Sequence, residues 1–371
     1  MRVTHTTSTR NGSPRFHELD VARSIALFGI IVMNYHGYLN GADAAGSLQS
    51  NWFLRLMDPW NGVLAPSPVI FVLVAGISCG ILTLPSIYSA DKINISTMRW
   101  VLIRRGLFLF IIGSIFEWVW RGTILPYYGV YFLLAALLFT SRIRHVALAA
   151  SVCILIAAVL AIWQFVREDA GHSTAWLRPY EPNSPRNLLF RTFIDYTHPV
   201  FPWFAFFCVG LIIGKSYLHF RSLRPRIVGI GAALLVVVYG VSALVQRSND
   251  GILQVMFSTD PFQRGVLATV GTCTSAVVVV ALISLGVERI PESPLVDLLQ
   301  RAGQVTLTLY VLHGLIYNAS VDWWGWVSTT GFMPALIFSA VVWIILISFG
   351  AWWQRFIGRG PLEIIYRKFG G

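Results

Sequence analysis

Long apolar stretches recur from one end of the chain to the other, and they constrain its fold more than any other feature. Each is close to the roughly 20 residues that a helix needs to cross the ~30 Å hydrocarbon core of a bilayer. Only 12% of the 371 residues are charged, whereas soluble domains carry about 25%. The sequence therefore predicts an all-α, polytopic membrane helix bundle of about ten transmembrane helices. The expected spans are 21–38, 67–85, 99–118, 124–140, 146–165, 199–215, 227–245, 265–285, 305–321 and 333–353.

Lysine and arginine are distributed unevenly between the predicted loops. With the N-terminus placed inside, 20 of the 28 fall on the inner side and 8 on the outer side. Because cations are retained on the cytoplasmic side of a membrane, both termini are predicted to be cytoplasmic. The net charge of +11 then reflects topology, and no nucleic-acid partner is expected. Residues 1–16 are expected to form a disordered cytoplasmic leader.

Several classes of site find no support in the sequence. The four cysteines, Cys79, Cys153, Cys208 and Cys273, lie inside predicted spans and are too widely spaced for a local metal motif. No metal is therefore expected. The sequence also contains no glycine-rich nucleotide loop and no Gly-x-Ser-x-Gly elbow, which disfavours soluble-type hydrolases and NTPases.

Two polar residues mark the outer end of the first predicted span. A histidine such as His36 can accept a proton from an attacking hydroxyl or amine, or carry an acyl group itself. Asn34, two residues earlier, can orient that histidine or stabilise an oxyanion. The alternative is that His36 and its neighbours only anchor a helix end at the membrane interface.

His313 is predicted to lie about 15 Å deep in the ninth span, near the middle of the membrane. An ionisable residue at that depth is a candidate for function. Tyr310, three residues earlier, lies on the same helix face. The alternative is a neutral imidazole that only hydrogen-bonds to another helix.

Two further sets of polar residues lie near opposite mouths of the predicted bundle. Arg104 and Arg105, just inside the cytoplasmic start of the third span, suit the phosphates of an anionic cosubstrate. The alternative for both is snorkelling to the interface. At the outer mouth of the sixth span, His198 either completes a polar site with His36 or caps a helix.

Segments along most of the chain resemble one family. LDVARSIALFGIIVMNY resembles the first span of the heparan-alpha-glucosaminide N-acetyltransferase family and of the related YeiB-like bacterial membrane proteins. PWNG followed by VIFVLVAGIS resembles the acetyltransferases' loop into span two, and FPWFAFFCVGLIIGK resembles a span of both groups. RRGLFLFIIG, ILPYYGVYFLL, GQVTLTLYVLHG and the tail GPLEIIYRKFG resemble the YeiB-like group.

This resemblance implies a transmembrane acyltransferase, with residues 17–371 forming a single acyltransferase-like domain. Asn34 matches the family's functional asparagine, and Trp60 and Asn61 match the tract after its active histidine. Met57 stands where that histidine is expected, which leaves His36 as the nearby imidazole. Such enzymes take an acyl group from acyl-CoA on the cytosolic face and give it to a glycan or similar acceptor on the other face.

The leading hypothesis is a multi-pass protein of the bacterial inner or plasma membrane that transfers an acyl group, acetyl in the first instance, from cytosolic acyl-CoA to an extracytoplasmic glycan or other envelope acceptor. In it, Arg104 and Arg105 hold phosphates of the cosubstrate, and Tyr310 and His313 line a central tunnel. Trp60, Asn61 and His198 contact the acceptor, a glycan or small molecule. The alternatives are a transporter or flippase for a lipid-linked or small anionic solute, and a non-catalytic relative. The partners are the lipid bilayer and the acceptor, and whether a homo-oligomer forms is left open.

Overall fold

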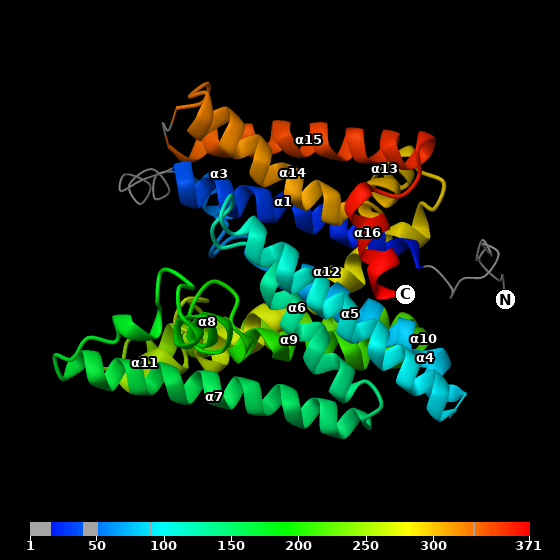
Figure 1. The fold of residues 1–371 in the computed structure, drawn as a ribbon. Coiled ribbons are helices and arrows are strands. Elements are labelled where there is room, and N and C mark those ends of the chain that lie inside the picture. Colours follow the sequence, from blue (N-terminus) through cyan, green and yellow to red (C-terminus); the bar gives the residue numbers. More distant parts are fainter. Residues whose placement is uncertain (1–15, 40–50, 90, 329–330) are drawn as a thin grey trace.

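The fold is built from helices (Figure 1). The computed structural model describes residues 16–39, 51–89, 91–328 and 331–371, and within these ranges no strand occurs. The prediction of an all-α fold is thereby confirmed. The α-helices are α1 (His17–Leu39), α3 (Trp52–Leu56), α4 (Ser67–Tyr88), α5 (Lys92–Phe116), α6 (Leu125–Leu138), α7 (Ile143–Asp169), α8 (Pro185–Phe193), α9 (Val200–Lys215), α10 (Tyr217–Val245), α11 (Gly251–Met256), α12 (Val266–Arg289), α13 (Pro294–Gly303), α14 (Thr306–Tyr317), α15 (Phe332–Phe356) and α16 (Pro361–Gly370). A short 3-10 helix (Ala175–Leu177) and a π-helix (Asn318–Trp323) complete the described elements.

Each predicted span coincides largely with a helix, although several helices extend beyond the predicted bounds. Within the described ranges, five helices are long and apolar enough to cross a membrane: α4, α7, α10, α12 and α15. Helices α6 and α9 are apolar but shorter. The chain is therefore a membrane protein, while the count of about ten crossings and the cytoplasmic termini stay predictions. The leader lies outside the described residues except for Phe16.

The bundle has two distinct ends (Figure 1). The start of α1, helix α13 and the C-terminal helix α16 lie together at one end, which we call the inner end. Helices α3, α8 and α11 lie toward the opposite, outer end. The two names follow the orientation that the charges predict. The described start of α1 and the C-terminus thus share an end of the bundle.

Helices α4 and α9 cross with their backbones in contact. A methyl group added to Gly76 would lie 2.2 Å from the carbonyl oxygen of Phe207, and one added to Gly210 would lie 2.2 Å from that of Leu73. Gly80 and Gly214 repeat this contact one turn further along. Small residues that allow backbones to approach are typical of helix pairs in membranes. This crossing fixes the segment before α9 close to the start of α4.

Helix α1 contacts α4, α12, α13, α14 and α15. Near its inner end, Arg23 pairs with Asp20 at 2.6 Å and donates to the Ser78 hydroxyl of α4 at 2.5 Å. The polar pair that opens the first span therefore holds two helices together. In the outer half of α1, the residues Ile30, Met33 and Asn34 face the pocket described next.

Candidate functional site

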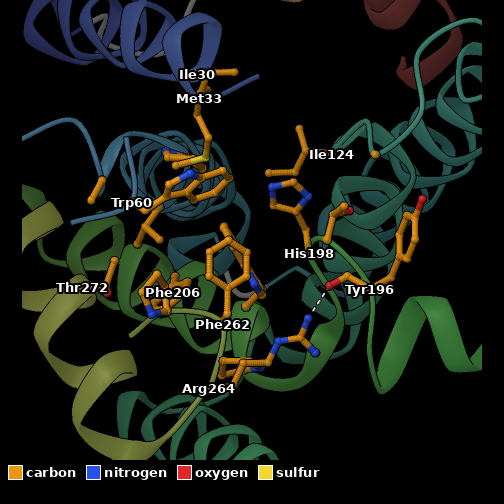
Figure 2. Close-up of a pocket in the computed structure, with 18 of the residues that line it drawn as sticks. Ile30, Met33, Trp60, Ile124, Tyr196, His198, Phe206, Phe262, Arg264 and Thr272 are labelled. Atoms are coloured by element: carbon orange, nitrogen blue, oxygen red, sulfur yellow. Dashed lines mark hydrogen bonds between the residues drawn. The ribbon is translucent and has the colours of Figure 1, made fainter. Parts of the chain in front are cut away.

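A pocket of about 410 Å³ lies toward the outer end, among α1, α4, α9, α12, α14 and the loops that join them. Figure 2 shows Trp60 and Phe262 on one side of this pocket and His198 and Ile124 on the other. The Trp60 and Phe262 rings lie 4.8 Å apart and form an aromatic wall. Most of the lining is apolar, so the few polar groups that reach the pocket decide its chemistry.

Asn34 lines the pocket, and its side chain is hydrogen-bonded to His313, which lies outside the pocket lining. The Asn34 Nδ2 and His313 Nε2 atoms lie 3.0 Å apart. The other ring nitrogen, Nδ1, contacts the backbone carbonyl of Tyr310, which can only accept a hydrogen bond. Nδ1 therefore carries the proton, and Nε2 accepts from the Asn34 amide. The Asn34 side chain is thereby fixed with its NH₂ group toward His313 and its oxygen turned away.

His313 is completely buried and does not line the pocket. Tyr35 donates from its hydroxyl to the His313 carbonyl at 2.8 Å, and the Trp120 ring lies 5.5 Å from the imidazole. His313 thus makes the hydrogen bond between helices that the alternative predicted. It contacts the pocket lining through Asn34 and through the Tyr310 ring, which lies 4.8 Å away.

Tyr310 lines the floor of the pocket and is buried. Its hydroxyl accepts from the backbone N–H of Ile124 at 3.1 Å and lies 3.2 Å from the Thr123 hydroxyl. These contacts bind α14 to the loop between α5 and α6. Tyr310 and Asn34 thus reach the pocket from two different helices.

His198 lines the pocket just before α9 begins. Tyr131 donates to its backbone carbonyl at 2.6 Å, and its ring packs 4.5 Å from Trp203. Its Nδ1 atom is buried and has no hydrogen-bond partner in the described part of the chain. Burial, and to a smaller extent the nearby Arg264 charge, lower the pKa of His198 to about 3. The imidazole is therefore neutral at physiological pH.

Three arginines also line the pocket: Arg121, Arg178 and Arg264. Arg264 and Arg178 share one carboxylate, since Asp195 lies 2.7 Å from Arg264 Nη1 and 3.1 Å from Arg178 Nε. Arg264 also donates to the backbone carbonyl of Tyr196 (Figure 2) and to that of Ile194. It thereby fixes the loop that carries His198.

Of the remaining residues predicted for the outer site, one lines the pocket and two do not. Trp60 lines the pocket, while Asn61 is exposed, does not line it, and donates to Asp58 at 3.2 Å. His36 is buried with its ring 4.6 Å from Phe332, and it does not line the pocket either. Residues two apart on a helix face nearly opposite ways. The structure therefore pairs Asn34 with His313, not with His36 as the sequence led us to expect.

Met57, which stands where the family's active histidine is expected, follows α3 and packs against a small cluster formed by Val32, Leu54, Phe332 and Leu336. His36 contacts Phe332 of the same cluster. Met57 and His36 both pack at this apolar cluster, and neither lines the pocket.

Arg104 and Arg105 lie on α5, and neither lines the pocket. Arg104 is exposed, and the Arg105 guanidinium lies 5.2 Å from the centre of the Tyr366 ring of α16. The Arg105 Nε atom is buried without a hydrogen-bond partner among the described residues. An anionic group could be accepted there. The pocket itself does not extend to this pair, so it is not the predicted tunnel between the two ends.

Sequence reasoning missed the arginine set. Arg121, Arg178 and Arg264 are three of the eight cations assigned to the outer side, where the charge bias disfavours them. An arginine on the side where the charge bias disfavours cations could have been taken as a candidate site residue. The sequence alone could not show that the three loops that carry these arginines meet in the fold.

Apolar helices around an outer pocket of asparagine, tyrosine, histidine and arginine define a membrane protein with a polar site toward one end. Residues 15–246, more than half of the chain, match the model described as heparan-alpha-glucosaminide N-acetyltransferase, catalytic, and the chain belongs to this family. Residues 214–370 match a second model, described as protein of unknown function (DUF418). The resemblance inferred from the sequence is thereby confirmed. No protein of curated function matches the chain.

The pocket draws on both matched regions. Asn34, Trp60 and His198 fall within the acetyltransferase match, while Arg264 and Tyr310 fall within the second. The site is therefore assembled across the two models.

Proposed function

We propose that the protein is a membrane-embedded acyltransferase that moves an acyl group, acetyl in the first instance, from cytosolic acyl-CoA to an extracytoplasmic acceptor bound in the outer pocket. The observation that carries the proposal is the Asn34 amide, held by His313 at 3.0 Å and directed into a pocket of a chain that belongs to an acetyltransferase catalytic family. The proposed location is the bacterial cell membrane.

Asn34 is suited to stabilise charge during acyl transfer. One of its N–H groups is occupied by His313, which leaves the second N–H and the oxygen for the reacting groups. A preorganised donor directed at a developing oxyanion contributes about 10²–10³-fold in rate. Because His313 fixes the amide, no reorientation is needed when that charge develops.

His198 is the proposed proton acceptor. With the thioester end of the acyl-CoA brought into the pocket, the acceptor's oxygen or nitrogen attacks the thioester carbonyl, the C–S bond breaks, and the proton passes through His198 to the leaving thiolate. Burial keeps the imidazole neutral, the form that can accept a proton. Because the same burial makes the ring a weak base, it passes the proton on within the transfer step and does not hold it. The unpartnered Nδ1 atom supports a ligand group at this position.

Arg104 and Arg105 are proposed to hold the phosphates of the acyl-CoA at the inner end. The unpaired Arg105 Nε and the exposed Arg104 side chain support this role. An Arg104→Ala change is expected to raise the KM for the acyl donor without altering the KM for the acceptor. A KM unchanged for both substrates would leave Arg104 as a topology residue.

Thiol release tests the proposal directly. Purified protein in lipid nanodiscs is incubated with acetyl-CoA and a panel of soluble sugars and amino sugars, and free thiol is measured. Asn34→Ala and His198→Gln are expected to lower the rate by about 10²-fold or more. His172→Gln, at an exposed outer histidine outside the pocket, is the matched control and is expected to keep the wild-type rate.

A separate His36→Gln variant distinguishes the two imidazoles. Loss of thiol release in this variant, with full activity in His198→Gln, would move the proton acceptor to His36. Uptake of a solute into proteoliposomes without thiol release would replace the acyltransferase with a transporter.

A further inference from the structure

The charge of the pocket lining is unbalanced. The described lining residues include three arginines and no aspartate or glutamate. We propose that the pocket selects an acceptor that carries an anionic group, a carboxylate or a phosphate, and that Arg178 and Arg121 bind this group. Calling the ligand an acceptor rests on the proposed function. The preference of the pocket for an anion concerns binding alone and does not depend on any transfer step.

The carboxylates next to the pocket do not neutralise these arginines. Asp195 serves both Arg178 and Arg264, so this set of three keeps one positive charge. Glu181 lies 4.0 Å from Arg121, and both side chains are more than half exposed. An ion pair of that kind is weak, so a ligand anion can displace it.

Arg178 has an unused binding face. Its Nε atom contacts Asp195 at 3.1 Å, and its terminal Nη groups have no hydrogen-bond partner among the described residues. The side chain is 56% exposed. Two parallel N–H donors match the two oxygens of a carboxylate or the oxygens of a phosphate. Arg178 is thus prepared for a bidentate contact that the chain itself does not supply.

Arg264 has a different part. Its donors are directed to Asp195 and to the carbonyls of Ile194 and Tyr196. It therefore builds the loop and supplies charge. Arg121 donates to the Tyr180 hydroxyl and stacks on its ring, so it supplies positive charge beside the ligand, while Arg178 makes the bidentate contact.

The rest of the pocket fits a ligand with a flat or apolar body. Trp60 and Phe262 form one wall, and Trp203 packs beside His198 on another. Aromatic faces stack on rings, while the surrounding apolar surface strengthens a charge contact by excluding water. The geometry favours an acceptor with an anionic group at one end and its reacting hydroxyl or amine toward Asn34 and His198.

Equilibrium binding tests the selection without any transfer step. The quenching of intrinsic tryptophan fluorescence is measured with glucuronate, glucose 6-phosphate, glucose and inorganic phosphate, in the absence of acyl-CoA. We expect glucuronate or glucose 6-phosphate to bind at least tenfold more tightly than glucose, with an affinity that falls as ionic strength rises. The tighter of the two sugars distinguishes a carboxylate from a phosphate. Inorganic phosphate binding as tightly as both would show an ion site with no sugar selection and would overturn the acceptor inference.

Charge-removing and charge-retaining variants assign the effect to residues. Arg178→Gln and Arg121→Gln are each expected to weaken binding of the preferred anion about tenfold and to leave glucose unchanged. Arg178→Lys should recover part of the loss. The matched control is Arg186→Gln, because Arg186 lies in the same outer region, stacks on Phe190 and does not line the pocket. Thermal unfolding shows whether each variant remains folded.

The outcomes separate this inference from the proposed function. Equal affinity for glucose and both anions, no anion binding at all, or equal loss in Arg186→Gln overturns the anion selection even if acetyl-CoA is consumed. Anion binding that depends on Arg178 without thiol release from any anionic acceptor supports the selection and overturns the acyltransferase.

Discussion

Asn34 and His313 are 279 positions apart and meet within a hydrogen bond. A single sequence suggested each as a candidate because polar groups are costly in hydrocarbon. It could not pair them, since the pairing depends on how α1 and α14 pack. The same sequence placed His36 with Asn34 on the ground of proximity along the chain. Helix geometry at a two-residue spacing already argues against that pair.

Replacing His313 is expected to act on Asn34 and not on acceptor binding. His313→Leu leaves the half-buried Asn34 amide without its partner, which costs about 1 kcal/mol in unfolding free energy and lets the amide rotate. We expect kcat to fall by about 10²-fold with little change in KM. His313→Gln, which keeps an acceptor atom, should lose less. Equal losses in both variants would contradict the positioning role.

His198 gives the protein a pH signature. Its folded-state pKa of about 3 lies below the ordinary value near 6.5. The unfolded chain therefore binds a proton below pH 6.5 while the folded protein does not, and this group's stabilising effect is lost as pH falls toward 3. We expect about 1.4 kcal/mol of loss per pH unit below 6.5. Thermal unfolding from pH 7 to 4.5 should show a smaller decline in His198→Gln.

Anion binding should show no inflection near pH 6.5 in the same range, because His198 stays neutral there. An inflection at that pH in the wild type that is absent in His198→Gln would show that the imidazole titrates normally.

At the scale of elements, the helices follow from apolar patterning, and their contacts do not. The sequence contains GISCG at 76–80 and GLIIG at 210–214, two small-xxx-small patterns of the kind that pack in membranes. The pattern marks a face on each helix without saying which helix it meets. The structure joins these two faces to each other.

The glycine crossing predicts a contrast between two equal substitutions. Gly210→Ala places a methyl group 2.2 Å from the Leu73 carbonyl oxygen, so the backbones must separate. We expect a loss of about 2 kcal/mol in unfolding free energy. Ligand binding in the pocket should also weaken, because α9 carries Trp203, which lines it. Gly240→Ala on α10 has open space at the added methyl and should be neutral or stabilising. Equal effects of the two in thermal unfolding would contradict the close crossing.

For the whole molecule, the charge bias predicts an orientation that chemical labelling can test. The cysteines at 79, 153 and 208 are buried and Cys273 is partly buried, so the background is quiet. In intact cells, a membrane-impermeant maleimide should label Asn249→Cys at the outer end. Glu292→Cys at the inner end should react only after permeabilisation. The reverse result would invert the topology.

Composition predicted a membrane bundle because so apolar a surface cannot be solvated by water. The pocket was only partly predictable, since three of its walls are loops whose meeting depends on Arg264 and Asp195. The position of His198 at a predicted outer mouth suggested this residue, and the family resemblance suggested Trp60; both line the pocket. Neither signal shows that three arginines from separate loops meet there.

Helix α1 is fastened at two levels, by Arg23 to Ser78 near one end and by Tyr35 to the His313 carbonyl near the other. A sliding or one-turn shift of α1 along its axis would break both attachments at once. Opening of the pocket must then come from the peripheral segments that bear Trp60, Arg178 and Phe262, while the floor formed by Asn34 and Tyr310 stays still. The protein would in that case admit its ligand by moving these peripheral segments, while helices α1 and α14 stay fixed. The two halves of the bundle would not rock against each other.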